Sequence, residues 1–487
     1  IMNKISCFLP YAGKEQVEKT VNSLQATGLI EEIRLITTDA TLESLPDCEI
    51  LFVDMPYSSA TLKAIANAAK GEYTLLYTKE TTLEMGMFAL ERMIHILEDS
   101  SAGMVYADHY QIADGKQSNA PVIDYQFGSL RDDFNFGSLL LFNTEKLKEA
   151  AGHMKSDYNF AGLYDLRLKL SQHSDLVHIN EYLYSEVEND TRKSGEKIFD
   201  YVDPKNRDRQ IEMEQACTEH LKEIGGYLAP EFKKIEFSAG NFEYEASVII
   251  PVRNRIRTIR DAIKSVLMQK TDFKYNLIII DNHSTDGTTE AIDEFKDDER
   301  LIHIVPERND LGIGGCWNVG VHHPKCGKFA VQLDSDDVYK DENTLAIMVR
   351  AFYEQNCAMV VGTYMMTDFN MNMIAPGIID HKEWTPANGR NNALRINGLG
   401  APRAFYTPVL REVKVPNTSY GEDYALGLNF SRQYQIGRVY DVVYLCRRWD
   451  DNSDASLDIV KMNGHNLYKD RIRTWELQAR IAMNKNK

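Results

Sequence analysis

The strongest constraint in this sequence is an internal repeat, because two distant parts of the chain carry the same order of apolar runs. Residues 247–251 and 276–280 are typical of buried strands, and the segment between them has apolar residues at helical spacing. Residues 5–10 and 33–36 flank a similar segment near the N-terminus. A strand, a helix and a second wholly apolar strand favour a parallel sheet with a right-handed crossover. The chain is therefore predicted to contain two α/β units.

The later parts of the two copies also match. Residues 70–76 align with 326–332, and residues 164–168 align with 422–426, in the same order. A chain of 487 residues is long enough for several domains of roughly 100–200 residues each. We predict an α/β fold with two tandem domains of mostly parallel sheet, joined by a helical linker. The predicted boundaries are 1–190 for the first domain, 191–243 for the linker and 244–487 for the second domain with a C-terminal helix.

Composition narrows the classes of partner and compartment. Asp and Glu outnumber Lys and Arg by 72 to 55, which gives a formal net charge of −17 and argues against a nucleic-acid partner. The seven cysteines form no Cys-x-x-Cys pair, so we expect reduced, buried thiols rather than disulfides or a zinc ribbon. No apolar run reaches the roughly 18 residues of a membrane span, and the first residues show no secretion signal. A cytoplasmic protein is expected.

The C-terminal segment from Tyr468 onward is predicted to be a helix. Ile472, Trp475 and Ala479 share one helical face with Tyr468, and basic residues outnumber acidic ones there. We expect this helix to pack on its own domain. Docking on the inner face of a membrane is the alternative, since a basic amphipathic helix favours anionic surfaces.

Two carboxylates follow a predicted strand of the second copy. Asp334 and Asp336 come directly after the apolar run 329–333, separated by Ser335. Ligands of open α/β sheets bind at the carboxyl ends of the strands. Carboxylate oxygens there suit Mg²⁺ or Mn²⁺. The alternative is a pair of solvated turn residues, which arise easily in an acidic chain.

Two loops of the second copy are candidates for nucleotide contact. Asp281 ends a predicted strand, where its carboxylate can accept a hydrogen bond from a ring N–H of a pyrimidine, and the following residues form a turn and a helix cap. The loop that begins at Asn309 contains Gly314, and glycines let backbone approach a ligand closely. The loop lacks a complete dinucleotide or Walker motif, so loop geometry alone is the alternative and is favoured.

A further pair of acids, Glu422 and Asp423, precedes an apolar helix. Acids favour the N-terminus of a helix for electrostatic reasons alone. The functional interpretation is a carboxylate that lies across the cleft as a general base.

These motifs occur in an order that resembles family-2 glycosyltransferases of the GT-A fold. The resemblance covers about residues 244–455, and more weakly the first copy, which is then a degenerate GT-A-like domain. It implies a metal-dependent inverting transfer of a sugar from a nucleotide-diphosphate sugar, with a UDP-sugar favoured, to a hydroxyl of a glycan or lipid-linked acceptor. Mn²⁺ or Mg²⁺ is the implied cofactor.

The resemblance also implies roles for individual residues. Asp423 is the implied base with Glu422 beside it, and Asp334 and Asp336 are the implied metal ligands. Acceptor or sugar contacts are expected near Trp384, Gly400 and Arg403. The residues expected to contact the nucleotide-sugar are Pro251, Val252, Arg253, Asn254, Asp281, Asn309, Gly314, Asp334, Ser335 and Arg448.

The sequence departs from the family where many members have a metal-binding histidine after the last core strand. The stretch 447–453 contains no histidine, so an aspartate substitutes or fewer side chains hold the metal. In the first copy, Lys79 stands at the place of Ser335, which disfavours a divalent cation.

Three alternatives stay open at the level of sequence. They are a bifunctional two-site polysaccharide polymerase, a non-catalytic carbohydrate-binding pseudoenzyme and a sugar-phosphate nucleotidylyltransferase. The last is disfavoured because residues 251–254 lack its glycine-rich signature.

Overall fold

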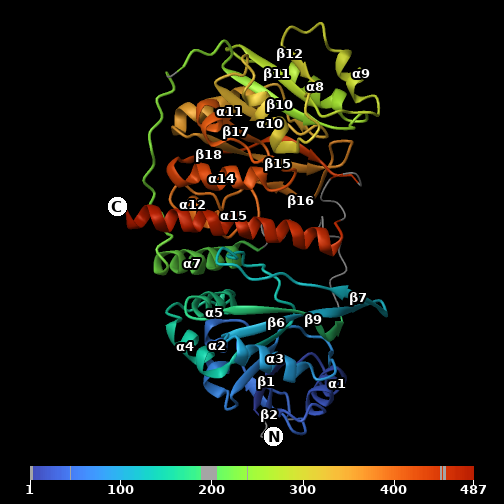
Figure 1. Ribbon diagram of the computed structural model, residues 1–487, viewed down its shortest axis with the longest axis vertical. Helices are drawn as coiled ribbons and strands as arrows, with labels where there is room; N and C mark the ends of the chain where they lie inside the picture. Colours follow the sequence, from blue (N-terminus) through green and yellow to red (C-terminus); the bar gives the residue numbers. More distant parts are fainter. Residues whose placement is uncertain are drawn as a thin grey trace. The chain divides into compact units, whose positions relative to one another are not determined.

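The computed structural model in Figure 1 describes residues 4–43, 45–187, 206–238, 240–449, 452 and 457–486. These residues divide into two compact units. The N-terminal unit contains the described residues up to 187 together with 206–226 and 457–474, and the C-terminal unit contains 227–449, 452 and 475–486.

The N-terminal unit is built on a nine-stranded sheet. Its strand order is β3-β2-β1-β4-β8-β6-β9-β5, with β7 paired to β6. The strands are β1 (Ile5–Pro10), β2 (Ile30–Thr37), β3 (Glu49–Phe52), β4 (Tyr73–Tyr77), β5 (Leu83–Met85), β6 (Met104–Ala113), β7 (Lys116–Ala120), β8 (Leu139–Asn143) and β9 (Leu176–Val187).

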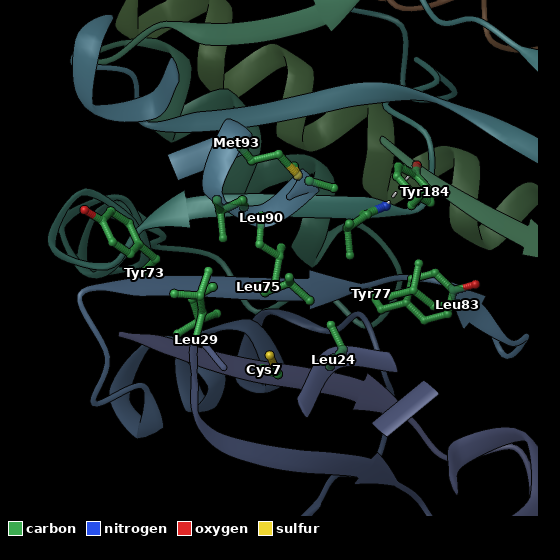
Figure 2. Close-up of a cluster of buried hydrophobic side chains, with 14 of the residues drawn as sticks. Cys7, Leu24, Leu29, Tyr73, Leu75, Tyr77, Leu83, Leu90, Met93 and Tyr184 are labelled. Carbon is green, nitrogen blue, oxygen red and sulfur yellow. Dashed lines mark hydrogen bonds between the residues drawn. The ribbon is translucent and has the colours of Figure 1, made fainter. Parts of the chain in front are cut away.

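Helices cover both faces of this sheet because alternate strand residues point to opposite sides. Figure 2 shows one side, where Cys7 and Leu75 of neighbouring strands lie near Leu24, Leu90 and Met93. A second core cluster on the other face joins the sheet to α2, α4 and α5. The helices are α1 (Lys14–Gln25), α2 (Ser59–Ala68), α3 (Ala89–Asp99), α4 (Thr144–His153), α5 (Gly162–Ser171) and α7 (Arg207–Glu223).

The C-terminal unit repeats this topology. Its nine-stranded sheet has the order β12-β11-β10-β13-β17-β15-β18-β14, with β16 paired to β15. The strands are β10 (Ala246–Val252), β11 (Tyr275–Asp281), β12 (Leu301–Ile304), β13 (Phe329–Gln332), β14 (Val338–Tyr339), β15 (Met359–Thr367), β16 (Met373–Ile379), β17 (Arg403–Tyr406) and β18 (Ile436–Arg447). The helices are α8 (Ile259–Leu267), α9 (Thr288–Asp293), α10 (Ile313–Val321), α11 (Thr344–Gln355), α12 (Gly389–Asn392), α13 (Thr407–Val413) and α14 (Glu422–Gln433).

The two sheets therefore confirm the predicted α/β class, and they share one strand order. The apolar strands that were predicted to be parallel are parallel: β10 pairs in parallel with β11 and β13, and β1 with β2 and β4. The other half of each sheet is mixed, since β17 and β8 run antiparallel to their neighbours. Each parallel half places its strand ends at one edge, where the candidate residues were expected.

The C-terminal helix α15 (Ile459–Lys485) differs from the expectation that it packs only on its own domain. Residues 457–474 belong to the N-terminal unit, where the Ser129 hydroxyl donates to Asp470 at 2.8 Å. Residues 475–486 belong to the C-terminal unit, where Arg480 donates to the Arg390 carbonyl oxygen at 2.7 Å. The predicted helix of the linker forms as α7, and it too belongs to the N-terminal unit. Among the described residues, no helix combines the length and the apolar character needed to cross a bilayer.

Candidate active site

A cavity of about 350 Å³ lies in the C-terminal unit where β10, β13 and β18 end and α14 begins. Its lining brings together acids and arginines that are far apart in the chain. Predicted site residues in the lining are Pro251, Asp334, Ser335, Asp336, Arg403, Glu422, Asp423 and Arg448.

The segment 334–337 after β13, called the acidic turn below, is fixed by hydrogen bonds to its neighbours. The Tyr444 hydroxyl and the backbone N–H of Arg447 donate to the two carboxylate oxygens of Asp337, at 2.9 and 2.8 Å. Asp337 is buried, and these two hydrogen bonds engage both of its carboxylate oxygens. Asp334 and Asp336 remain partly exposed at the cavity wall, and Asp334 accepts from the Gln332 amide at 2.8 Å. All three acids of the turn line the cavity, but only Asp334 and Asp336 are partly exposed, while both Asp337 oxygens accept hydrogen bonds within the fold.

The residues present fit a divalent cation that is completed by a ligand. Within the described ranges, no three His, Cys, Asp or Glu side chains are grouped to hold a metal ion by themselves. Mg²⁺ is commonly held by one or two carboxylates together with substrate phosphates, and Asp334 and Asp336 supply such a pair. The Asn452 amide donates to Asp336 at 3.2 Å, while the predicted substitute ligands at positions 450 and 451 lie outside the described residues.

The acids at the start of α14 lie against a buried arginine. The guanidinium of Arg403 on β17 is 3.0 Å from the carboxylate of Asp423. The pKa of Arg403 is raised, because Asp423, Asp334 and Glu422 together outweigh the effect of its burial. Arg403 was predicted to contact the acceptor; the structure places it in the cavity lining and pairs it with the predicted base.

Glu422 differs from Asp423 in its surroundings. Burial, with the nearby charges of Asp423 and Asp334, raises the pKa of Glu422 to about 8. One of its carboxylate oxygens is buried without a hydrogen-bond partner in the described structure. Burial therefore favours the protonated form of Glu422, whereas the Asp423 carboxylate faces the Arg403 guanidinium.

The glycines after Asn309 serve packing. A Cβ on Gly314 would collide with the Pro416 carbonyl oxygen, and one on Gly312 would lie 2.7 Å from the Thr418 carbonyl carbon. Helix α10 can therefore approach the segment that leads to Glu422, and it places Trp317 in the cavity wall. Asn309 is exposed and does not line the cavity.

Asp281 does not reach the cavity. It is fully buried at the end of β11, where its carboxylate accepts from the Thr289 hydroxyl at 2.5 Å and from the backbone N–H of Ser284 at 3.0 Å. Burial alone would raise the pKa of Asp281, but hydrogen bonds from His303, Ser284 and Thr289 lower it overall. The structure thus gives Asp281 the role of ordering the loop after β11.

The segment after Pro251 forms the opposite side of that loop. Val252 is buried, while Arg253 and Asn254 are exposed and lie outside the cavity lining. Asn254 has a left-handed backbone with φ of 54° and accepts from the backbone N–H of Thr285 at 2.8 Å. Of the four residues predicted here, only Pro251 lines the cavity.

Two residues predicted near the acceptor, Trp384 and Gly400, do not line the cavity. Trp384 is 1% exposed, so its ring cannot stack on a sugar in the cavity. Gly400 packs against His381 and Tyr364, and a Cβ there would meet the Tyr364 ring at 2.6 Å. The expected acceptor or sugar contact of Trp384 is therefore wrong.

The two arginines at the end of β18 have different surroundings. Arg447 is 1% exposed and is paired with Asp261 at 2.8 Å, so it holds the fold. Arg448 lines the cavity.

Several lining residues were missed from the sequence. They come from positions whose neighbours are set by tertiary contacts: Arg255, Ile313, Trp317, Gln332, Asp337, Tyr364, Ala401, Phe405, Val415, Leu426, Cys446 and Asn452. A signal existed only for Arg255, since it follows the 251–254 stretch at the end of β10.

Comparisons with known proteins find similarity to glycosyltransferases in the same unit. Residues 247–404 match the family model described as Glycosyl transferase family 2. That match covers most of the strands that surround the cavity, so the similarity to this family lies in the C-terminal unit.

Relatives named as glycosyltransferases match the chain in part. An uncharacterized glycosyltransferase of Rickettsia felis is 37% identical over 198 residues, which are 40% of this chain and 31% of that protein. The GalNAc(5)-diNAcBac-PP-undecaprenol beta-1,3-glucosyltransferase of Campylobacter jejuni is 36% identical over 93 residues, which are 19% of this chain and 29% of that protein. The match thus spans about a third of the length of each relative.

Among solved structures, S. aureus TarS 1-349 in complex with UDP-GlcNAc aligns with a TM-score of 0.35 at 16% identity. The alignment covers 50% of this chain and 72% of TarS 1-349.

The N-terminal unit has a different polar cluster at the corresponding strand end. Lys79 lies just after β4, as Ser335 lies after β13, and its ammonium is 2.7 Å from the carboxylate of Glu186. The His109 ring lies 3.1 Å from the same oxygen, and the Ser138 hydroxyl donates to the other one. Burial would raise the pKa of Glu186, but His109 and Lys79 lower it to about 2.

We predict that Glu186→Gln destabilises the N-terminal unit. The substitution removes the charge that Lys79 and His109 face, and hydrogen bonds to charged groups contribute about 1–3 kcal/mol each. Urea unfolding at pH 7 is the measurement, with Glu84→Gln, an exposed glutamate on β5, as the control. Because the pKa of Glu186 is lowered, its stabilisation is present above its ordinary pKa of 4.5 and is lost as the pH falls toward 2. Equal stability of the two variants would contradict the prediction.

Proposed function

We propose that the C-terminal unit is a metal-dependent inverting glycosyltransferase. Its donor is a nucleotide-diphosphate sugar, with a UDP-sugar favoured, and its acceptor is a hydroxyl group of a glycan or a lipid-linked glycan. The observation that carries the proposal is the convergence of Asp334, Asp336 and the Arg403–Asp423 pair on one cavity. The family 2 match over residues 247–404 supports it.

The donor's diphosphate is proposed to lie between the acidic turn and the arginines. Asp334 and Asp336 would hold Mn²⁺ or Mg²⁺, which when bound supplies positive charge for the leaving diphosphate. Arg255 and Arg448 also line the cavity and can donate to phosphate oxygens. These cations explain how an acidic cavity can accept an anionic donor.

Asp423 is the proposed general base. Its carboxylate would take the proton of the acceptor hydroxyl as that oxygen bonds to the anomeric carbon, while the bond from this carbon to the diphosphate oxygen breaks and UDP leaves. Arg403 holds Asp423 in place at 3.0 Å, and burial raises the pKa of the neighbouring Glu422. A base opposite the leaving group implies in-line displacement with inversion.

The acceptor class is proposed from the name of one relative. The name of the Campylobacter jejuni relative describes glucosyl transfer to a glycan on undecaprenyl diphosphate. A lipid-linked glycan is therefore the acceptor class that we propose to test first.

We propose that the N-terminal unit is a degenerate copy without transferase activity. The internal Lys79–Glu186 pair occupies the place of the acidic turn, and this contact disfavours a divalent cation there. It also argues against the bifunctional polymerase.

The test is a screen of nucleotide-sugars by thermal shift with Mn²⁺, because a bound donor raises the melting temperature with its occupancy. The donor that stabilises the chain is then assayed for UDP release with glycan acceptors. We expect one UDP-sugar to stabilise the protein and to be turned over. Stabilisation without turnover for any acceptor would favour the non-catalytic carbohydrate-binding pseudoenzyme instead.

A further inference from the structure

The N-terminal unit contains a second cavity, of about 290 Å³, that the proposed transfer reaction does not use. It lies beside the end of β4 and the first turns of α5, and helix α7 contributes to its wall. This is the same topological place that the catalytic cavity occupies in the C-terminal unit.

The pairing of strands shows how the lining has changed. Leu141 pairs with Leu75 as Ala404 pairs with Val331, so Leu140 stands where the other unit has Arg403. Leu140 lines the N-terminal cavity, as does Thr78, which takes the place of Asp334. Two charged positions of the catalytic cavity, Arg403 and Asp334, are thus uncharged here, whereas Asp165 keeps an acid at the place of Asp423.

The deep part of the cavity is apolar. Met104, Leu140, Phe142 and Leu166 line it and are each at most 4% exposed. The rings of Phe134 and Phe136 contribute to the same wall.

The polar groups at depth are engaged with the protein. The Tyr164 hydroxyl donates to the Leu130 carbonyl oxygen at 2.5 Å. Arg167 donates to the Ser129 carbonyl oxygen at 2.7 Å and to the Tyr125 hydroxyl at 3.1 Å. A sugar buried at this depth would leave hydroxyl groups without partners, which is unfavourable. A hydrocarbon chain or ring has no such penalty.

The mouth of the cavity has a different character. Asn159 and Arg209 are exposed there, and Phe160 is 38% exposed beside them. Asp132 also lines the cavity. Polar side chains of both signs at the mouth suit a hydroxyl-rich, uncharged head group.

We propose that this cavity binds the apolar tail of an amphipathic glycoside whose sugar head lies at Asp132, Asn159 and Arg209. The N-terminal unit is then a binding module for a glycolipid-like molecule. The inference does not depend on the transferase activity, since it concerns binding to a different unit.

The probe is octyl β-glucoside, titrated calorimetrically into the full chain below its micelle concentration. We expect binding at one site, and no binding of glucose, because the tail supplies the contact area. Leu163→Trp should lower the affinity at least about 10-fold by filling the cavity, since Leu163 is a half-buried lining residue. Phe160→Ala should lower it about 3- to 10-fold by removing apolar contact at the mouth.

Phe127→Ala is the matched control, because Phe127 is an exposed phenylalanine of the same unit that does not line the cavity. The affinity of the Phe127→Ala variant for octyl glucoside should equal that of the unmodified chain. Octyl phosphate has the same tail with an anionic head group. If it bound more tightly than octyl glucoside, the proposal of an uncharged head group would be wrong. Equal binding by the Phe160 and Phe127 variants, or binding of glucose as strong as that of octyl glucoside, would overturn the cavity assignment. Thermal shift with UDP and Mn²⁺, read in parallel, keeps this result separate from the fate of the proposed transferase.

Discussion

Asp423→Asn is expected to reduce sugar transfer by about 10²–10⁴-fold while donor binding stays nearly intact. The amide cannot accept the proton of the acceptor hydroxyl, but it keeps the size of the carboxylate. Asp423 faces the cavity from the first turn of α14, and its partner Arg403 is held independently by the Leu399 carbonyl oxygen. The measurements are UDP release in the presence of acceptor and calorimetric titration of the donor.

The control for this variant is Asp441→Asn, which changes an exposed aspartate on β18 outside the cavity. Its transfer rate should match that of the unmodified chain. An equal loss of transfer and donor binding in Asp423→Asn would make Asp423 structural. A larger loss of transfer in Glu422→Gln than in Asp423→Asn would assign the base to Glu422.

The fold could be predicted because its information is local and repeated. Runs such as 247–251 and 276–280 are buried on both faces of a sheet, and therefore they read as continuous apolar segments. The acids after β13 were predictable for a related reason. The carboxyl ends of parallel strands meet at one edge, so a polar residue that follows a strand has a defined place.

Sequence reasoning failed where a side chain's partner lies far away in the chain. A tryptophan ring can pack against a sugar, but Trp384 is buried. Its burial is set by the surrounding tertiary structure and not by its neighbours in sequence. Asp281 follows a strand as Asp334 does, but the Thr289 hydroxyl and the Ser284 N–H use its oxygens. The pairing of Arg403 with Asp423 joins β17 to α14, and no local pattern encodes it.

The remaining prediction concerns the acidic turn. Asp336→Ala is expected to weaken binding of UDP in the presence of Mn²⁺ by about 30-fold or more. Loss of one partner from a desolvated charge pair costs about 2–5 kcal/mol, which is the basis of this factor. The side chain is partly exposed and its neighbours Asp334 and Asp337 remain, so the turn itself should persist. Calorimetric titration with UDP is the measurement, with Asp297→Ala, an exposed acid outside the cavity, as the control.

Removal of the metal tests whether Asp336 is a metal ligand or only an acidic residue that lies near the donor. With EDTA, Asp336→Ala should bind UDP at least as tightly as the unmodified chain, because the carboxylate then has no cation to hold and only repels the diphosphate. If Asp336 instead acted through the shape of the turn, the variant would be weaker than the unmodified chain both with and without Mn²⁺. Affinity for UDP that is unchanged by the substitution in the presence of Mn²⁺ would remove Asp336 from the proposed metal site.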